Sequence, residues 1–195
     1  MVSAILLAAG ASLRMGYDKL LLPLSGKPIL FHCIENILLS KAKELVLVLR
    51  KENKKIISSL INKNIRVIIN SEPERGISSS LILGWSNISS ESKGGMIMLG
   101  DMPFISFRVI DDLISKFLRG KKGIVYPVYK GKKGHPVILD KKYDHDIKSL
   151  RGDEGARSIV EKNKNDVEEV EVNDKGVILD IDNYKDYIRL KDSII

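Results

Sequence analysis

Cysteine, aromatic residues and long apolar runs are all scarce in this chain of 195 residues, and each absence narrows the possible functions. Cys33 is the only cysteine, which excludes an internal disulfide and a metal site built from several cysteines. No apolar run reaches the ~20 residues that a membrane-spanning helix needs. The apolar first residues lack the basic residue that begins a signal peptide. We therefore expect a protein of the reducing cytoplasm that does not enter a membrane.

Two phosphate-binding signatures are also missing from the glycine-containing stretch at residues 7–19. It lacks the Gly-Lys-Ser/Thr ending of a Walker A loop. It also lacks the Gly-x-Gly-x-x-Gly turn that a nicotinamide-dependent oxidoreductase shows after its first strand. The sequence therefore disfavours both of these nucleotide-binding classes.

The positive charge is spread along the chain instead of being concentrated in one segment. Lys and Arg number 32 against 25 Asp and Glu, a formal net charge of +7. The densest basic groups, at residues 51–55 and 130–133, are short. This distribution is typical of a solvated, Lys-rich surface, and it also suits a positive field that attracts polyphosphates. If the protein is not an enzyme, the alternative is a basic module that binds nucleic acid. We favour the solvated surface and therefore expect no nucleic-acid partner.

Short apolar runs alternate with helical patterns through the first part of the chain. The expected strands are residues 3–7, 44–49, 65–69 and 95–99, and the expected helices are residues 28–39, 54–61, 78–88 and 106–118, the last capped by Ser106. This alternation predicts an α/β fold with a mostly parallel sheet covered on both faces. Right-handed crossovers would make it a Rossmann-like, three-layer α/β/α fold.

The pattern changes beyond residue 120. Residues 123–128 and 135–139 are expected to form strands joined by the Lys-rich turn at 130–133, which predicts an antiparallel hairpin in the C-terminal half. Residues 167–172 alternate as a further strand, and residues 184–190 are expected to form a closing helix. Because no repeat or long linker divides the chain, we expect a single domain over residues 1–195.

Three unusual clusters follow expected strands, at residues 7–19, 70–80 and 100–103. In an open α/β sheet, ligands bind outside the carboxyl ends of the strands. The first cluster offers small residues that let a ligand approach the backbone, and Arg14 and Lys19 add positive charge suited to a triphosphate. The alternative is a flexible turn with two solvated cations.

Acidic residues form the other chemical signal. Asp101 leaves a buried strand, where a carboxylate can hold Mg²⁺, although an Asp before a Pro can also simply form a turn. Asp180 and Asp182 are separated by one residue and point the same way if the chain is extended. One of them could be a second metal ligand; otherwise they cap the closing helix.

At these residues the chain resembles the MobA-like nucleotidyltransferase family, and within it the molybdenum-cofactor cytidylyltransferases. The matching stretches run in family order: LAAG at residues 7–10 with Ser12, Arg14, Met15, Gly16 and Lys19, LGDMP at 99–103, GHPV at 134–137, GDEGAR at 152–157 and DID at 180–182. The fold implied is the nucleotidyltransferase fold. Residues 1–119 would mainly bind the nucleotide, and residues 120–195 would mainly bind the acceptor and complete the sheet.

The resemblance also implies a role for individual residues. The nucleotide would be bound by Leu7, Ala8, Ala9, Gly10, Arg14, Lys19, Asn70, Gly76 and Ser79. Arg14, Lys19 and Asp101 would be the catalytic residues, with Asp101 and Asp182 holding Mg²⁺ or, as the alternative, Mn²⁺. The acceptor would be bound by His135, Gly152, Asp153 and Arg157, although His135 could instead order a turn.

The reaction implied is the transfer of a nucleoside monophosphate, with CTP as the favoured donor and molybdopterin as the favoured phosphorylated acceptor. A phosphate monoester is largely dianionic at neutral pH, since its second pKa is near ~6, so it needs no general base. Two departures from the family stand out: Asn183-Tyr184 replaces a common Thr-Pro, and the aromatic residue usual before Gly76 is missing. A guanylyltransferase and a sugar-1-phosphate nucleotidyltransferase therefore remain alternatives.

Overall fold

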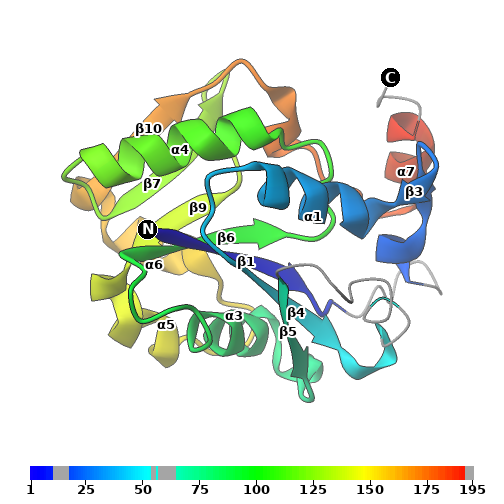
Figure 1. Ribbon diagram of the computed structural model, residues 1–195, viewed down its shortest axis with the longest axis horizontal. Helices are drawn as coiled ribbons and strands as arrows, with labels where there is room; N and C mark the ends of the chain where they lie inside the picture. The colour runs from blue at the N-terminus through cyan, green and yellow to red at the C-terminus, as the bar shows by residue number, and fades with distance from the viewer. Residues whose placement is uncertain (11–17, 54–55, 57–64, 192–195) are drawn as a thin grey trace.

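The computed structural model describes residues 1–10, 18–53, 56 and 65–191, and its centre is a single large sheet (Figure 1). Four strands run parallel: β1 (Val2–Ala8), β4 (Leu45–Arg50), β5 (Ile65–Asn70) and β6 (Gly94–Leu99). With the later strands β7 (Ile124–Tyr129), β9 (Val137–Asp140) and β10 (Val167–Glu171), the spatial order is β10-β7-β9-β6-β1-β4-β5. The four N-terminal strands agree with the sequence-based prediction, which confirms the α/β fold with a mostly parallel sheet.

Helices cover both faces of this sheet (Figure 1). On one side lie α1 (Ile29–Leu39) and α4 (Phe107–Arg119), and on the other lie α3 (Ile77–Trp85), α5 (Asp144–Ser149) and α6 (Ala156–Lys162). All seven residues of β1 are buried, as a strand covered on both faces requires. Ser106 caps α4 as expected, because its Oγ accepts a hydrogen bond of 3.4 Å from the Val109 amide.

Alternate residues of β1 enter two separate cores. Leu6 packs in the core that contains Ile34 of α1 and Ile110 of α4. Its neighbour Leu7 packs in the opposite core, together with Trp85 of α3. The two-residue period of the strand therefore holds both helical layers on the sheet.

The C-terminal half completes the sheet with the expected hairpin. In it, β9 (Val137–Asp140) lies between β6 and β7 (Ile124–Tyr129) and runs antiparallel to both, and β8 (Lys132–Lys133) pairs with the end of β7. At the edge, β10 (Val167–Glu171) runs parallel to β7. The prediction omitted α5 and α6, which have only six and seven residues and little helical periodicity to reveal them. The helix expected at residues 54–61 lies outside the described residues, apart from Ile56.

A third, smaller core joins the two ends of the chain. The short strands β2 (Pro23–Leu24) and β3 (Lys27–Pro28) lie beside α7 (Tyr184–Leu190), as Figure 1 shows. Leu24 and Ile181 are completely buried in this core, and the Tyr187 hydroxyl donates a 2.7 Å hydrogen bond to the Pro23 carbonyl. This packing brings the stretch before α7 to the carboxyl ends of the parallel strands. None of the helices among the described residues has both the length and the apolar character of a membrane-spanning segment.

Candidate active site

The carboxyl ends of β1 and β6 meet closely and form the floor of the site. The Gly100 amide donates a 2.9 Å hydrogen bond to the Leu7 carbonyl. A Cβ on Gly100 would lie 3.2 Å from that same carbonyl oxygen and 3.2 Å from the Cβ of Ala8. Small residues here let the two strand ends come close together.

A cavity of about 520 Å³ opens over these strand ends. Its wall contains many of the residues predicted to bind the nucleotide or the metal: Leu7, Ala8, Ala9, Gly10, Lys19, Gly76, Asp101 and Asp182. Asp153, predicted on the acceptor side, also lines it. The structure therefore gathers residues from both ends of the sequence around one hollow. Arg14 lies outside the described residues.

Lys19 is the electrostatic centre of this cavity. Its Nζ lies 2.8 Å from Asp101 Oδ2 and 3.1 Å from Asp182 Oδ1. Burial alone would lower the pKa of Lys19, but the two carboxylates outweigh burial and raise it. The ammonium is therefore charged at neutral pH and bridges two acidic side chains from distant parts of the sequence.

The stretch at residues 180–182 is fixed beside Asp101 by the backbone. The Ile181 amide donates a 2.9 Å hydrogen bond to the Asp101 carbonyl, while the Ile181 side chain is completely buried. Asp182 can thus reach Lys19. Burial, together with the nearby carboxylates of Asp182 and Asp101, raises the pKa of Asp180. Asp180 thus lies near enough to Asp182 and Asp101 for their charges to act on it.

The same carboxylates fit a magnesium-type cation. Asp101 Oδ1 is buried and has no hydrogen-bond partner among the described protein atoms, so it is an acceptor that nothing in this part of the chain satisfies. Among the described residues, no three His, Cys, Asp or Glu side chains are arranged to hold a metal by themselves. Mg²⁺ typically binds through one or two carboxylates together with substrate phosphates and waters, so the pair Asp101 and Asp182 is compatible with it.

Asn70 and Ser79 stabilise the segment at residues 70–80, which follows β5, and neither residue lines the cavity. The buried Asn70 amide donates 2.9 Å hydrogen bonds to Ser79 Oγ and Ser80 Oγ, and Asn70 Oδ1 accepts one of 2.9 Å from the Glu72 amide. All polar groups of the Asn70 side chain thus have partners inside the loop. Its predicted contact with the nucleotide base stays a prediction, whereas Ser80 does line the cavity.

Gly76 joins this loop to the GDEGAR segment. Its φ of +86° lies in the region that favours glycine, and a Cβ there would lie 2.3 Å from the Gly152 carbonyl oxygen. The same carbonyl accepts a 3.1 Å hydrogen bond from the Ser78 amide at the start of α3. Gly152 itself has a φ of +57°. The predicted acceptor segment is therefore docked against the predicted nucleotide segment.

A second cavity of about 620 Å³ adjoins the first. Leu7, Ile77, Leu99 and Asp153 line both cavities. His135 and Arg157, both predicted on the acceptor side, line only the second, whose floor is apolar and includes Leu81 and Val160. Gly152 lines neither cavity. Arg157 is 90% exposed and pairs with Glu161 at 2.7 Å, so its guanidinium lies at the rim.

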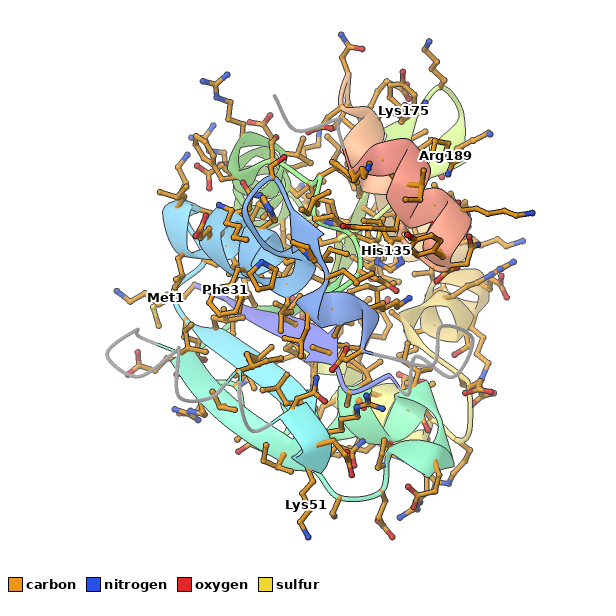
Figure 2. The ribbon with its side chains drawn as sticks, turned by 90° about the vertical axis from the view of Figure 1, so that its right-hand side faces the viewer. Met1, Phe31, Lys51, His135, Lys175 and Arg189 are labelled. Carbon is orange, nitrogen blue, oxygen red and sulfur yellow. The ribbon has the colours of Figure 1, made fainter. Side chains whose placement is uncertain are left out.

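His135 is held from its backbone and its ring is kept neutral. Its amide donates a 2.8 Å hydrogen bond to the Val177 carbonyl, and the His135–Pro136 peptide bond is cis. Burial lowers the pKa of His135 despite the opposing charge of Asp101, and the ring Nδ1 is buried without a partner among the described residues. In Figure 2, Lys51 and Arg189 extend from the surface, whereas His135 lies among interior side chains.

Several cavity residues escaped the sequence analysis. Tyr126, Lys133 and Glu161 line the second cavity, whereas Glu74 and Ile77, which also line cavities, lie within the cluster predicted at residues 70–80. Lys133 directly precedes the GHPV motif, so its place in the sequence could have indicated that it lies at the site. Tyr126 lies on β7 and Glu161 on α6, and the place of both at the site depends on tertiary packing.

The chain belongs to the MobA-like NTP transferase domain family, whose model matches residues 4–168. Among its relatives is a protein of Natranaerobius thermophilus named "Probable molybdenum cofactor guanylyltransferase". It is 37% identical over 132 residues, which are 67% of this chain and 62% of that protein. The match thus spans less than two thirds of the relative's length.

Solved structures give the same fold. The crystal structure of Rv0371c from Mycobacterium tuberculosis H37Rv has a TM-score of 0.88 at 26% identity, over 97% of this chain and 96% of that one. A complex of Rv0371c with manganese has a TM-score of 0.84 at 22% identity, over 99% of each chain. The resemblance to the MobA-like family is confirmed. The narrower resemblance to cytidylyltransferases is not confirmed, because the relative is named as a probable guanylyltransferase.

Proposed function

We propose that this protein transfers a nucleoside monophosphate from a nucleoside triphosphate to a phosphorylated small molecule and releases pyrophosphate. The observation that carries the proposal is the common wall of the two cavities, which is formed by Leu7 and Leu99 at the ends of two strands, Ile77 at the start of α3, and Asp153. A donor in the first cavity and an acceptor in the second would meet at this wall. The cluster of Lys19, Asp101 and Asp182 lies in the donor cavity.

The chain's own residues would work by positioning and by charge. Lys19, with Arg14 from the first loop, would bind the triphosphate, and the small residues from Ala8 to Gly10 would let the base and ribose approach the backbone. Asp101 and Asp182 would hold Mg²⁺ or Mn²⁺, which supplies charge neutralisation on the phosphates. The neutral ring of His135, together with Asp153 and Arg157, would shape the acceptor side.

The proposed step needs no general base. A phosphate monoester is already largely dianionic at neutral pH, so its oxygen can attack the α-phosphorus while the bond to pyrophosphate breaks. This agrees with the environment of His135, whose lowered pKa suits a neutral ring that neither repels nor attracts the acceptor phosphate by charge. The chemistry would depend on alignment of the two substrates across the shared wall.

Molybdopterin is the acceptor that we propose, with GTP and CTP as the two candidate donors. The guanylyltransferase name of the Natranaerobius relative supports GTP. The double alanine of the first loop and the GDEGAR stretch support CTP, through the resemblance to cytidylyltransferases. Each candidate thus rests on a separate observation.

The test is a matrix of the four α-³²P-labelled triphosphates with molybdopterin, a sugar 1-phosphate or no acceptor, in the presence of Mg²⁺ or Mn²⁺. We expect labelled product and pyrophosphate with molybdopterin and with one of GTP and CTP. If product forms with the sugar 1-phosphate and not with molybdopterin, the acceptor is a sugar phosphate and the assignment of molybdopterin is wrong. Absence of transfer from every triphosphate would refute the proposal.

A further inference from the structure

We propose that Asp18, held by Asn53 and Arg50, is a positioning residue that sets where Lys19 presents its ammonium to the triphosphate. This inference rests on the proposed function. Asp18 directly precedes Lys19, and the three side chains link the end of β4 to the short 3₁₀ turn Lys19–Leu21. None of the three was singled out by the sequence.

Both oxygens of the Asp18 carboxylate have defined partners. Oδ1 accepts a 3.1 Å hydrogen bond from the Leu20 amide and so caps the turn that begins at Lys19. Oδ2 accepts a short hydrogen bond from the Asn53 side-chain amide. The Asn53 oxygen accepts in turn a 2.8 Å hydrogen bond from Arg50 Nε. The capping carboxylate is therefore tied to a strand end of the central sheet.

Burial makes this arrangement rigid. Asn53 is 2% exposed, and the side chains of Asp18 and Arg50 are 13% and 18% exposed. Polar groups with so little access to water are costly to leave unpaired, so their mutual hydrogen bonds favour one geometry. Leu20, which follows Lys19, is also buried and lines the donor cavity. The backbone of Lys19 is thus fixed from both sides.

The charges in the cluster of Asp18, Asn53 and Arg50 give a second reason to assign it a positioning role. A carboxylate next to Lys19 would repel a triphosphate if it were left uncompensated. The Arg50 guanidinium lies 3.7 Å from Asp18 Oδ2, and the two charges largely cancel in this partly buried place. The positive charge of Lys19 can therefore act on the phosphates while its neighbour caps the turn without opposing it.

A reciprocal exchange of side chains tests the positioning role. In Asp18→Asn, the new amide oxygen would stay with the Leu20 amide and the Asn53 oxygen with Arg50, so an NH₂ group would face an NH₂ group. In Asn53→Asp a carboxylate oxygen would face the Asp18 carboxylate, so each single variant sets two donors or two acceptors against each other. The double variant restores an amide opposite a carboxylate. The new amide at position 18 can still cap the turn through its oxygen, and the new carboxylate at position 53 can still accept from Arg50. The exchange keeps the size of both side chains.

The measurement is the affinity for GTP and for CTP, with Mg²⁺ and without acceptor, by titration calorimetry on protein whose folded fraction is known from thermal unfolding. We expect each single variant to bind about tenfold more weakly and the double variant to recover to within about threefold of wild type. The KM for the acceptor should not change.

The outcomes separate the two proposals. If wild type binds triphosphate and both single variants bind it equally well, the positioning role is wrong and the proposed function stands. If the single variants only unfold more easily while their folded fraction binds normally, the cluster is structural and the role is again wrong. If wild type itself binds no triphosphate, the proposed function fails and the inference fails with it.

Discussion

The Lys19 ammonium lies 2.8 Å from Asp101 Oδ2 and, together with its 3.1 Å contact to Asp182, occupies the space between the two carboxylates that would hold a metal ion. In the protein without substrate, the charge of these two carboxylates is therefore already partly neutralised by the single ammonium of Lys19. A triphosphate would offer the Lys19 ammonium a stronger anionic partner. Once the ammonium had moved from the two carboxylates to the triphosphate, the carboxylates would be free to bind the metal. Metal and nucleotide should accordingly bind together.

Lys19→Met tests this competition. Without the ammonium, Mn²⁺ should bind the free protein about tenfold more tightly, because the two carboxylates are no longer paired. Triphosphate affinity should fall by about 10- to 100-fold, because a charged hydrogen-bond donor is lost. Electron paramagnetic resonance measures free Mn²⁺, and calorimetry measures the nucleotide.

The matched control is Lys121→Met, which removes an exposed lysine far along the sequence. It should change neither affinity. Equal Mn²⁺ binding in wild type and Lys19→Met would show that the ammonium and the metal do not compete.

Asp101→Ala should abolish turnover while the protein stays folded. The variant removes the buried Oδ1, which has no partner among the described residues, along with the contact to Lys19, so the free energy of unfolding should change by less than about 1.5 kcal/mol. Turnover should fall at least about 100-fold, because the charge that neutralises the phosphates is no longer held. Asp112→Asn, at an exposed position on α4, is the control and should retain full activity. A fully active Asp101→Ala would remove this residue from the metal site.

Gly76→Ala should disturb the wall between the two cavities. The new Cβ would lie 2.3 Å from the Gly152 carbonyl oxygen, at a φ of +86°. We expect a loss of about 1–3 kcal/mol in the free energy of unfolding and higher KM values for both substrates. Gly131→Ala is a matched control, since Gly131 also has a positive φ, of +75°, but nothing lies within 4 Å of its Cβ position. It should cost only about 1 kcal/mol and leave both KM values unchanged. Equal effects of the two variants would exclude the steric explanation.

Much of this architecture could be predicted because the signals are local. The apolar runs of β1, β4, β5 and β6 appear directly in the sequence, and the rule that ligands bind at the carboxyl ends of strands places Lys19 and Asp101 together. The insertion of β9 between β6 and β7 was not predictable, because a hairpin pattern does not say which neighbour its second strand takes. The six- and seven-residue helices α5 and α6 bury only a few apolar residues each, too few for a helical period to show.

The roles of polar side chains depended even more on tertiary structure. Asn70 is a polar residue at a strand end, as ligand-binding residues often are, yet in the structure its side chain forms hydrogen bonds with Ser79, Ser80 and Glu72. Asp18 looks like an ordinary turn residue, and only its contact with Asn53, 35 residues away, reveals the cluster. A sequence indicates which residues carry polar groups, whereas the partners that satisfy those groups come from distant parts of the chain.

Asp166 should make the stability of the protein depend on pH. Its Oδ2 accepts hydrogen bonds from Lys142 Nζ at 2.7 Å, the Tyr143 hydroxyl at 2.6 Å and the Gly123 amide at 3.1 Å, and so ties β7 to the start of β10. Burial alone would raise the pKa of Asp166, but these hydrogen bonds outweigh it and hold the pKa below the ordinary value of 3.8. Because the folded pKa is the lower one, the stabilisation is fully present above the ordinary value and is lost as the pH falls through the folded pKa.

Asp166→Asn should therefore lower the free energy of unfolding by about 1–3 kcal/mol at pH 7, since a charged acceptor of three hydrogen bonds is replaced by a neutral one. As the pH falls below the ordinary pKa and then through the lower folded pKa, the wild-type carboxylate takes up its proton, and the difference between the two proteins should shrink toward pH 2. Urea unfolding at intervals from pH 7 to pH 2 measures this difference. Asp112→Asn, whose carboxylate is exposed on α4, should show a difference near zero throughout. A difference for Asp166→Asn that stays constant down to pH 2 would mean that its cost arises from packing, and that the charge of Asp166 does not stabilise the fold.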